Sequence, residues 1–144
     1  MPRPPFTCPC CGLPSLRCWG TATCSICWWE IDLIDRADDE ICNGPNRGYS
    51  LNQARANFRA HGHMYDADRA SGYLQLCGTG REPLMAYVRS VRSGDTALDQ
   101  ATLDRLIAED RDSWPWRQEP YDAAAHEHEE ALLRVLLKDG PGMS

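Results

Sequence analysis

The residues of this chain whose types and spacing suggest chemistry are two pairs of cysteines near its start. Cys8-Pro9-Cys10-Cys11-Gly12 is followed, after eleven intervening residues, by Cys24-Ser25-Ile26-Cys27. A Cys-x-x-Cys turn directs two sulfurs toward one point, and a second such turn can supply the opposite pair of a tetrahedron, which is the geometry of structural zinc. The spacing therefore predicts one structural Zn²⁺. Its four ligands would be Cys8, Cys11, Cys24 and Cys27.

Other interpretations of the same cysteines are a disulfide pair and a thioredoxin-like redox motif. The redox motif requires a Cys-x-x-Cys that opens a helix in a βαβ unit, whereas here the two pairs flank a short hairpin-like stretch. A catalytic zinc is disfavoured because four thiolates leave no open coordination position. Cys10 could replace a neighbouring ligand. The thiols without an evident role in the sequence are Cys10, Cys18, Cys42 and Cys77.

The charge of the chain limits its partners. The 144 residues carry a formal charge of −6 at pH 7; four thiolates would add four negative charges and Zn²⁺ two positive ones, giving −8. An acidic protein repels phosphate backbones, which makes general nucleic-acid binding unfavourable and favours a basic partner. No stretch is long and apolar enough to span a membrane, and the Pro-rich start has no apolar signal region. We therefore expect a cytoplasmic protein, with no membrane partner, in a compartment where free thiols persist.

The segment between and after the cysteine pairs is expected to form a short hairpin with a small core. The hairpin would turn near Gly20-Thr21. The side chains on one of its faces would be Leu16, Cys18 and Ala22. Trp28 and Trp29 follow the second pair directly, and we expect them to cover the metal site and to be buried, because aromatic side chains dominate small cores.

A helix is predicted to close this first module, which would comprise residues 1–62. Ser50 and Gln53 form a capping-box pattern, and Gly62 can adopt the left-handed conformation that ends a helix. The helix should therefore occupy 51–61. His61 and His63 lie on either side of Gly62. Because no third ligand is visible nearby, we do not expect them to form a second metal site. We expect them to lie at the end of the helix, where the helix dipole favours histidine.

The C-terminal half is predicted to be helical. Residues 63–81 are expected to form a linker or a short helical turn, and a helical region follows over 82–144. Apolar spacing and caps within it predict helices over 82–92, 99–111 and 122–138. Since amphipathic helices cannot bury their apolar stripes alone, they should pack together and on the cysteine module. The expected fold is a small α+β protein, with a zinc-ribbon-like module and short β-hairpin preceding a mainly helical region.

Two features are candidates for contact with a partner. Residues 30–40 contain six acidic residues and one arginine. Such a run is usually a solvated loop, and the sharper hypothesis is an acidic face that attracts a basic protein. The acids assigned to this contact are Asp38, Asp39 and Glu40. Trp114 and Trp116 lie in a loop, where burial against the helices is the expected outcome and a binding hot spot is the alternative.

Three separated motifs are together typical of one family. They are Cys8-Pro9-Cys10-Cys11-Gly12, Ile26-Cys27-Trp28-Trp29-Glu30 and Ser50-Leu51-Asn52-Gln53-Ala54-Arg55-Ala56-Asn57-Phe58. Over about residues 6–62 the chain resembles the bacterial cysteine-rich CPCC family. The resemblance implies a zinc-ribbon-like module that ends in a helix, without an established enzymatic activity; some members resemble immunity proteins encoded beside toxins. The chain departs from the family pattern at Ser25, where proline is frequent, and at Ile31, where an acid is usual, and neither departure removes an expected ligand.

The favoured hypothesis is a non-enzymatic, protein-binding module that holds one Zn²⁺, including the role of an immunity protein that neutralises a basic toxin. The alternative is a zinc ribbon that binds nucleic acid or the transcription machinery. Its candidate basic strip consists of Arg47, Arg55, Arg59 and Arg69. An enzyme is not expected, because the sequence offers no nucleophile–base pair, paired carboxylates or open metal site in a recognisable motif.

Overall fold

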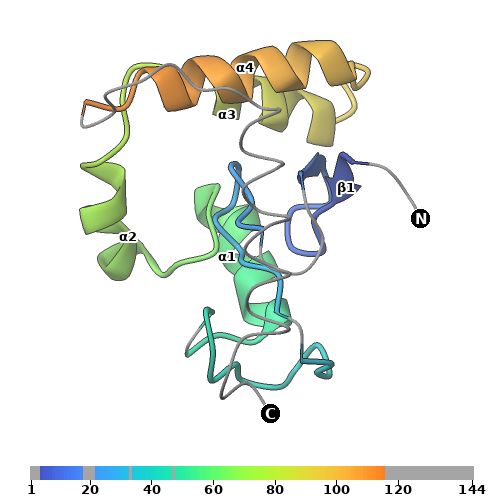
Figure 1. The fold of residues 1–144 in the computed structure, drawn as a ribbon, viewed down its shortest axis with the longest axis vertical. Coiled ribbons are helices and arrows are strands. Elements are labelled where there is room, and N and C mark those ends of the chain that lie inside the picture. The colour runs from blue at the N-terminus through green and yellow to red at the C-terminus, as the bar shows by residue number, and fades with distance from the viewer. Residues whose placement is uncertain (1–3, 18–21, 33, 47, 116–144) are drawn as a thin grey trace, which may run out of the picture.

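The structure is a computed structural model that describes residues 4–17, 22–32, 34–46 and 48–115. A two-stranded antiparallel sheet is followed by four helices (Figure 1). The elements are β1 (Phe6–Thr7), β2 (Pro14–Leu16), α1 (Leu51–His61), α2 (Ala67–Leu74), α3 (Arg81–Arg92) and α4 (Gln100–Asp112). The predicted α+β class, with a short hairpin in the cysteine-rich part and helices after it, is confirmed.

Each cysteine pair is enclosed by its own pair of extended segments. β1 and β2 flank the first knuckle, by which we mean residues 8–12, and Phe6 pairs with Leu16. An isolated bridge between Thr23 and Glu30 flanks the second knuckle, residues 24–28. The described strands therefore close around the knuckles, whereas the predicted hairpin turn and Cys18 lie outside the described residues. The predicted burial of Leu16 and Ala22 is confirmed, at 0% and 2% exposure.

Helix α1 begins and ends as its caps predict. The Ser50 hydroxyl accepts from the backbone N–H of Gln53 at 3.1 Å, and the Gln53 side chain accepts from the Ser50 N–H at 2.9 Å. At the other end Gly62 has φ +83°, and its N–H donates to the carbonyl of Phe58. Ala54 and Phe58 are buried on the inner face. The helix therefore presents one apolar face to the cysteine module and a polar face to solvent.

The segment 63–81, predicted as a linker or a short helical turn, is partly helical. It contains the eight-residue helix α2, and Met64 and Ala70 within it are fully buried. Within α2 itself only Ala70 is buried. One small alanine makes a weak apolar stripe, so periodicity gave little sign of the helix.

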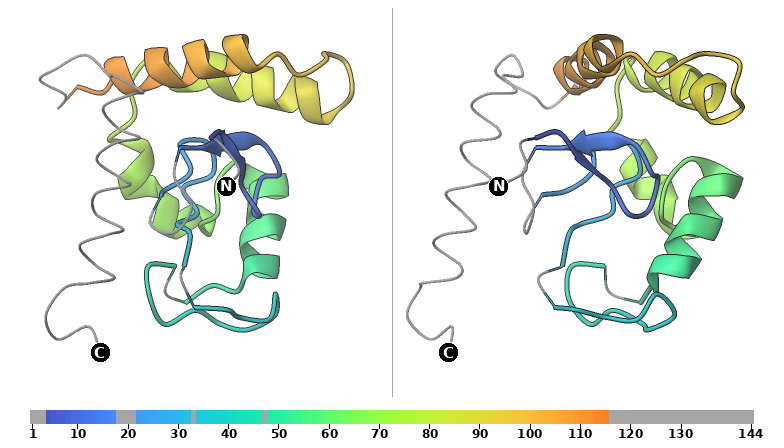
Figure 2. Two further views of the ribbon diagram at one scale, coloured as in Figure 1. Left: turned by 45° about the vertical axis from the view of Figure 1, so that its right-hand side comes forward. Right: turned by 90° about the vertical axis from the view of Figure 1, so that its right-hand side faces the viewer.

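Helices α3 and α4 lie side by side and cover one end of the molecule (Figures 1 and 2). Their facing residues are Leu84, Met85, Val88, Leu103, Leu106 and Ile107, and all are buried. These residues form one continuous core with the cysteine module, and α4 contacts β2. The amide of Gln100 also donates to the carbonyl of Pro14 at 3.1 Å. The predicted packing of helices on the module holds for these two; the predicted third helix, over 122–138, lies outside the described residues.

Two glycines before α3 allow its start to approach α4 closely. A Cβ placed on Gly80 would lie 2.5 Å from the Cα of Asp110 and 2.6 Å from the carbonyl oxygen of Glu109. A Cβ on Gly78 would overlap the backbone of Ser113. Contacts this short with backbone atoms cannot be relieved by turning a side chain. The Gly-Thr-Gly sequence is thus explained by helix packing.

We expect Gly80→Ala to destabilise the fold by about 1–3 kcal/mol or more, because α3 and α4 must separate to admit the methyl group. Gly72→Ala is the matched control. Gly72 lies within α2, and a Cβ added there would meet nothing within 4 Å, so alanine should stabilise that helix by up to about 1 kcal/mol. Urea unfolding followed by circular dichroism measures both. Equal stabilities for the two variants would contradict the packing argument.

None of the helices in the described part of the chain combines the length and the apolar character needed to traverse a bilayer.

Candidate metal centre

The two knuckles share one backbone geometry. In the first, the N–H of Gly12 donates to the carbonyl of Cys8 at 2.8 Å, and the N–H of Cys8 donates to the carbonyl of Leu13 at 2.9 Å. In the second, Trp28 donates to Cys24 at 2.9 Å and Cys24 donates to the carbonyl of Trp29 at 2.8 Å. The two loops therefore close with the same pair of hydrogen bonds. In each loop, one bond joins residues four apart in the sequence and the other joins residues five apart. Each loop aims its two sulfurs inward.

The residue after the second cysteine of each knuckle has a left-handed backbone. Gly12 has φ +77°, which suits glycine, while Trp28 has φ +71°, which is unusual for a residue with a large side chain. Trp28 is held there by its ring contacts. The guanidinium of Arg81 lies 4.5 Å from the centre of the indole, and the ring of His63 stacks on it at 5.5 Å. Its neighbour Trp29 is buried, as predicted, whereas Trp28, which was also expected to be buried, is half-buried.

The four cysteines predicted as ligands meet in one buried cluster. Their sulfurs all lie within 4.8 Å of one another. Sγ of Cys8 is 3.6 Å from Sγ of Cys27, and Sγ of Cys11 is 3.7 Å from Sγ of Cys24. A regular tetrahedron with Zn–S distances of about 2.3 Å has edges of about 3.8 Å, so the separations fit a metal ion at the centre. They exceed the roughly 2.05 Å of a disulfide bond, and all four cysteines are free.

Hydrogen bonds in the cluster favour negative charge on one sulfur above all. Sγ of Cys24 lies 2.9 Å from the hydroxyl of Ser15, and the N–H groups of Ile26 and Cys27 point at it from 3.4 and 3.5 Å. Burial opposes ionisation, but hydrogen bonds from the neighbouring thiols and Ser15 hold the pKa of Cys24 well below its usual value. Burial raises the pKa of Cys27. Loss of the proton from all four thiols is therefore unfavourable without a counter-charge. A bound cation would supply the positive charge that stabilises four thiolates.

The remaining cysteines of the described part of the chain are free thiols outside this group. Cys10 is buried at 6% exposure beside the cluster, where its hydrogen bond contributes to the raised pKa of Cys27. Cys42 is buried, and Cys77 is half-buried. Cys18 lies outside the described residues.

A buried arginine joins the second knuckle to α3. Arg81, the first residue of α3, donates to the carbonyls of Ser25 at 3.2 Å, Ile26 at 2.6 Å and Gly62 at 3.1 Å. Two of these acceptors lie between the paired cysteines. Burial lowers the pKa of the guanidinium, while Asp110 and the knuckle thiols raise it. Arginine stays protonated in proteins, so Arg81 places a positive charge beside the sulfurs.

Two more arginines bind the first knuckle in the same manner. Nε of Arg55, on α1, donates to the carbonyl of Pro9 at 3.0 Å. Arg92, at the end of α3, donates to the carbonyl of Cys11 at 3.1 Å and lies over the ring of Phe58. Both knuckles are thus held through backbone carbonyls by guanidinium groups from helices. Sequence reasoning missed these roles, since a carbonyl acceptor leaves no trace in residue type.

The acids assigned to a partner lie on the surface at the end of α1 remote from α3 and α4 (Figure 1). Asp38 pairs with Arg55 at 2.9 Å, and Glu40 pairs with Arg36 at 3.2 Å. Asp38 and Glu40 remain 56% and 52% exposed, and Asp39 is exposed as well. These carboxylates are therefore only partly neutralised.

The two tryptophans and the two histidines proposed as candidates have different outcomes. Trp114 is half-buried, with the guanidinium of Arg111 5.0 Å from its ring centre. Trp116 lies outside the described residues. His61 is the last residue of α1, as predicted, while His63 is buried against Trp28. Neither histidine joins the metal cluster.

Comparison with known proteins bears on the cysteine-rich part of the chain. Residues 6–73 match the family described as Cysteine-rich CPCC. The match supports the resemblance inferred from the three motifs, and it extends through most of α2. The CPCC match thus contains both knuckles and α1, whereas Arg81 and Arg92, which hold the knuckles, lie beyond it. No curated protein and no solved structure matches the chain.

Proposed function

We propose that the cysteine cluster holds one structural Zn²⁺ and that the chain is a non-enzymatic, bacterial, cytoplasmic protein-binding module. The observation that carries the proposal is the buried sulfur tetrahedron. Zinc accepts four thiolates without a geometric preference of its own, and such sites are structural. With four sulfurs bound, no position remains for a substrate. The ion would cross-link the two knuckles and so fix the platform on which α1, α3 and α4 pack.

The partner surface in this proposal is the acidic segment, residues 30–40. Its exposed acids lie beside Ile34, which is 60% exposed, and the adjoining Ile41 is 46% exposed. Large apolar side chains surrounded by charge are typical of a protein-binding surface, where they supply buried area and the charges supply steering. The overall charge of −6 suits a basic partner. The family resemblance suggests its class: a toxin that this chain neutralises as an immunity protein.

The first experiment is native mass spectrometry of the protein purified from its own cells under reducing conditions. One zinc per chain together with a stoichiometric basic protein is the expected result. One zinc without a partner would support the metal site alone and remove the support for an immunity role. A chain with intact thiols and no metal would overturn the proposal.

Charge reversal then tests the acidic surface with the captured partner. The variant Asp38→Lys/Asp39→Lys/Glu40→Lys should slow association by about tenfold or more at low salt, because steering by complementary charge governs the on-rate. The control Asp68→Lys/Glu82→Lys/Asp95→Lys makes the same change of net charge at exposed positions of the helical part. It should have a much smaller effect. Equal on-rates for the two variants would exclude residues 38–40 as the docking surface.

The nucleic-acid alternative has less support, because two arginines of its candidate strip are engaged within the chain. Arg55 binds Pro9 and Asp38, and Arg69 lies over the rings of Tyr49 and Tyr65 at 5.1 and 5.2 Å. Binding to DNA and RNA measured across salt concentration tests this alternative. We expect no affinity even at low salt; a steep salt-dependent affinity would favour it instead.

A further inference from the structure

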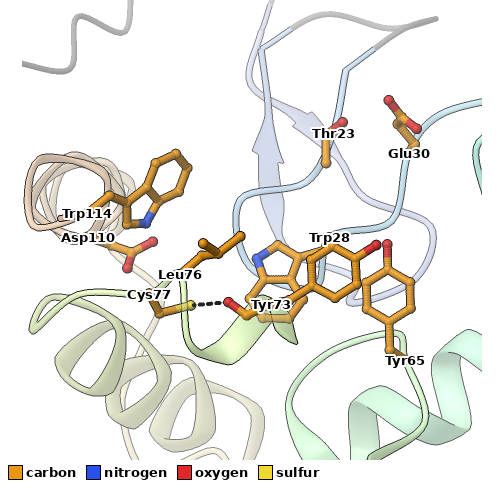
Figure 3. Close-up of a pocket in the computed structure, with 9 residues that line it drawn as sticks. All are labelled: Thr23, Trp28, Glu30, Tyr65, Tyr73, Leu76, Cys77, Asp110 and Trp114. Carbon is orange, nitrogen blue, oxygen red and sulfur yellow. Dashed lines mark hydrogen bonds between the residues drawn. The ribbon is translucent and has the colours of Figure 1, made fainter. Parts of the chain in front are cut away.

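A cavity of about 250 Å³ lies apart from the sulfur cluster, between the second knuckle, α2 and α4. Figure 3 shows Trp114 and Asp110 on one side of it and Trp28 and Tyr73 on the other, with Leu76 and Cys77 between them. It is smaller than the 300–1,000 Å³ that is usual for drug-sized ligands. A molecule with a single ring or a short chain would fill it.

A buried carboxylate with an unused acceptor lines this cavity. Asp110 is 1% exposed, and its Oδ1 accepts no hydrogen bond from any group in the described part of the chain. Burial raises the pKa of the Asp110 carboxyl, against the charges of Arg81 and Arg111 and a hydrogen bond from Trp114. Buried polar atoms in folded proteins nearly always have a partner, and exceptions in a cleft mark candidate binding sites.

The nearest buried cation does not supply the missing donor. Arg81 is directed at the backbone carbonyls of Ser25, Ile26 and Gly62, and its planar face lies on Trp28. Its charge acts on the Asp110 carboxylate, as does that of Arg111, without a hydrogen bond to Oδ1. The carboxylate therefore feels a positive charge but lacks a hydrogen-bond donor at Oδ1.

The walls of the cavity suit the apolar part of an organic cation. Four aromatic rings line it, and Tyr65 and Tyr73 are stacked at 4.6 Å between ring centres. Glu30 and Asp110 are among the residues that line the cavity, and neither lysine nor arginine is. Aromatic rings with nearby carboxylates attract ammonium groups through the ring quadrupole and through direct charge.

We propose that this cavity binds a small organic ammonium ion that carries an N–H group. The N–H would donate to Oδ1 of Asp110, and the hydrocarbon part would lie against Trp28, Tyr73 and Trp114. The site is built by the second knuckle and its flanks, by the end of α2 with the residues that follow it, and by the end of α4. It needs no group of the sulfur cluster as a ligand. Apart from Glu30, it shares no residue with the segment 30–40, to which we assign the protein-binding role.

Calorimetric titration of the zinc-loaded full chain with benzylamine, protonated at pH 7.5, tests the proposal. Benzyl alcohol is the uncharged comparator of similar shape. Benzylamine should bind about tenfold more tightly or better, because only the ammonium group supplies a charge-assisted hydrogen bond. Asp110→Asn should remove that advantage, whereas the control Asp68→Asn, an exposed acid on α2, should keep it. Equal binding of amine and alcohol to the wild-type chain, or an unchanged advantage in a folded Asp110→Asn variant, would overturn the proposal.

Cys77 provides a second measurement on the wild-type chain. Its thiol lines the cavity and is half-buried. Benzylamine should slow its alkylation by iodoacetamide, followed by peptide mass spectrometry, while benzyl alcohol at equal concentration should protect it far less. If Asp110→Asn fails to fold, this experiment decides alone: an alkylation rate unaffected by benzylamine would refute the site.

Discussion

Replacing Cys24 with serine should abolish metal retention and unfold the cysteine-rich part of the chain. Cys24 is fully buried, and three N–H or O–H groups converge on its sulfur. Zinc held by four thiolates contributes about 10–16 kcal/mol of apparent binding free energy, which is also folding free energy. An entire small domain is stable by only about 5–15 kcal/mol. Losing one of four ligands therefore removes most of what stabilises this part of the fold.

The matched control for this change is Cys42→Ser. Cys42 is also buried, at 4% exposure, but lies outside the sulfur cluster. Its replacement should cost about 1–3 kcal/mol through the buried hydroxyl and leave the zinc in place. Zinc content by native mass spectrometry and helix content by circular dichroism separate the two variants. A Cys24→Ser protein that retains one zinc per chain and native helix content would show that Cys24 is not a ligand.

The sulfur cluster could be predicted from the sequence because its geometry is local. Two residues between paired cysteines fix each pair, and the chain has only to bring two such turns together. The conformation of Trp28 was not predicted, since a tryptophan seldom has positive φ. The signal was available: aligning the two knuckles places Trp28 opposite Gly12, whose left-handed turn the sequence does suggest. The stacking that holds Trp28 there depends on His63 and Arg81, which are distant in sequence.

Features that depend on tertiary contacts could not be predicted from the sequence. Helices α1 and α4 have side-chain caps, and α3 has a proline in its first turn and a strong apolar stripe, so the ranges of all three were predicted closely. Helix α2 has one buried alanine and no side-chain cap, so nothing in its sequence distinguished it from a linker. Gly78 and Gly80 resembled a loop because the backbone that they must admit belongs to α4, some thirty residues further on. Sequence patterns indicate local structure. They do not show where two distant backbone segments approach each other closely.

The role of Arg81 also depends on tertiary contact and could not be predicted from the sequence. An arginine at the start of a helix is ordinarily solvated, yet this one is 9% exposed and donates to three carbonyls. Two of those carbonyls lie between Cys24 and Cys27. The side chain thereby fixes the second knuckle to α3 and places a positive charge near a site that carries −2 when four thiolates bind Zn²⁺. It would act on a bound metal ion through the knuckle, as a positioning residue.

We therefore expect Arg81→Met to destabilise the zinc-loaded protein by about 3–5 kcal/mol, because three buried carbonyls lose their donors while the volume is retained. Outer contacts of metal ligands typically change metal affinity by about 10–100-fold, so zinc should also pass more readily to a competing chelator. Arg89→Met is the control on the same helix. The Arg89 side chain is 61% exposed and pairs with Glu82 at the surface, which predicts a loss of about 0–1 kcal/mol. Urea unfolding and chelator competition measure the two effects separately. If both variants lose the same stability and keep wild-type zinc affinity, the guanidinium of Arg81 does not couple α3 to the metal centre, and the knuckle must be held by its own hydrogen bonds.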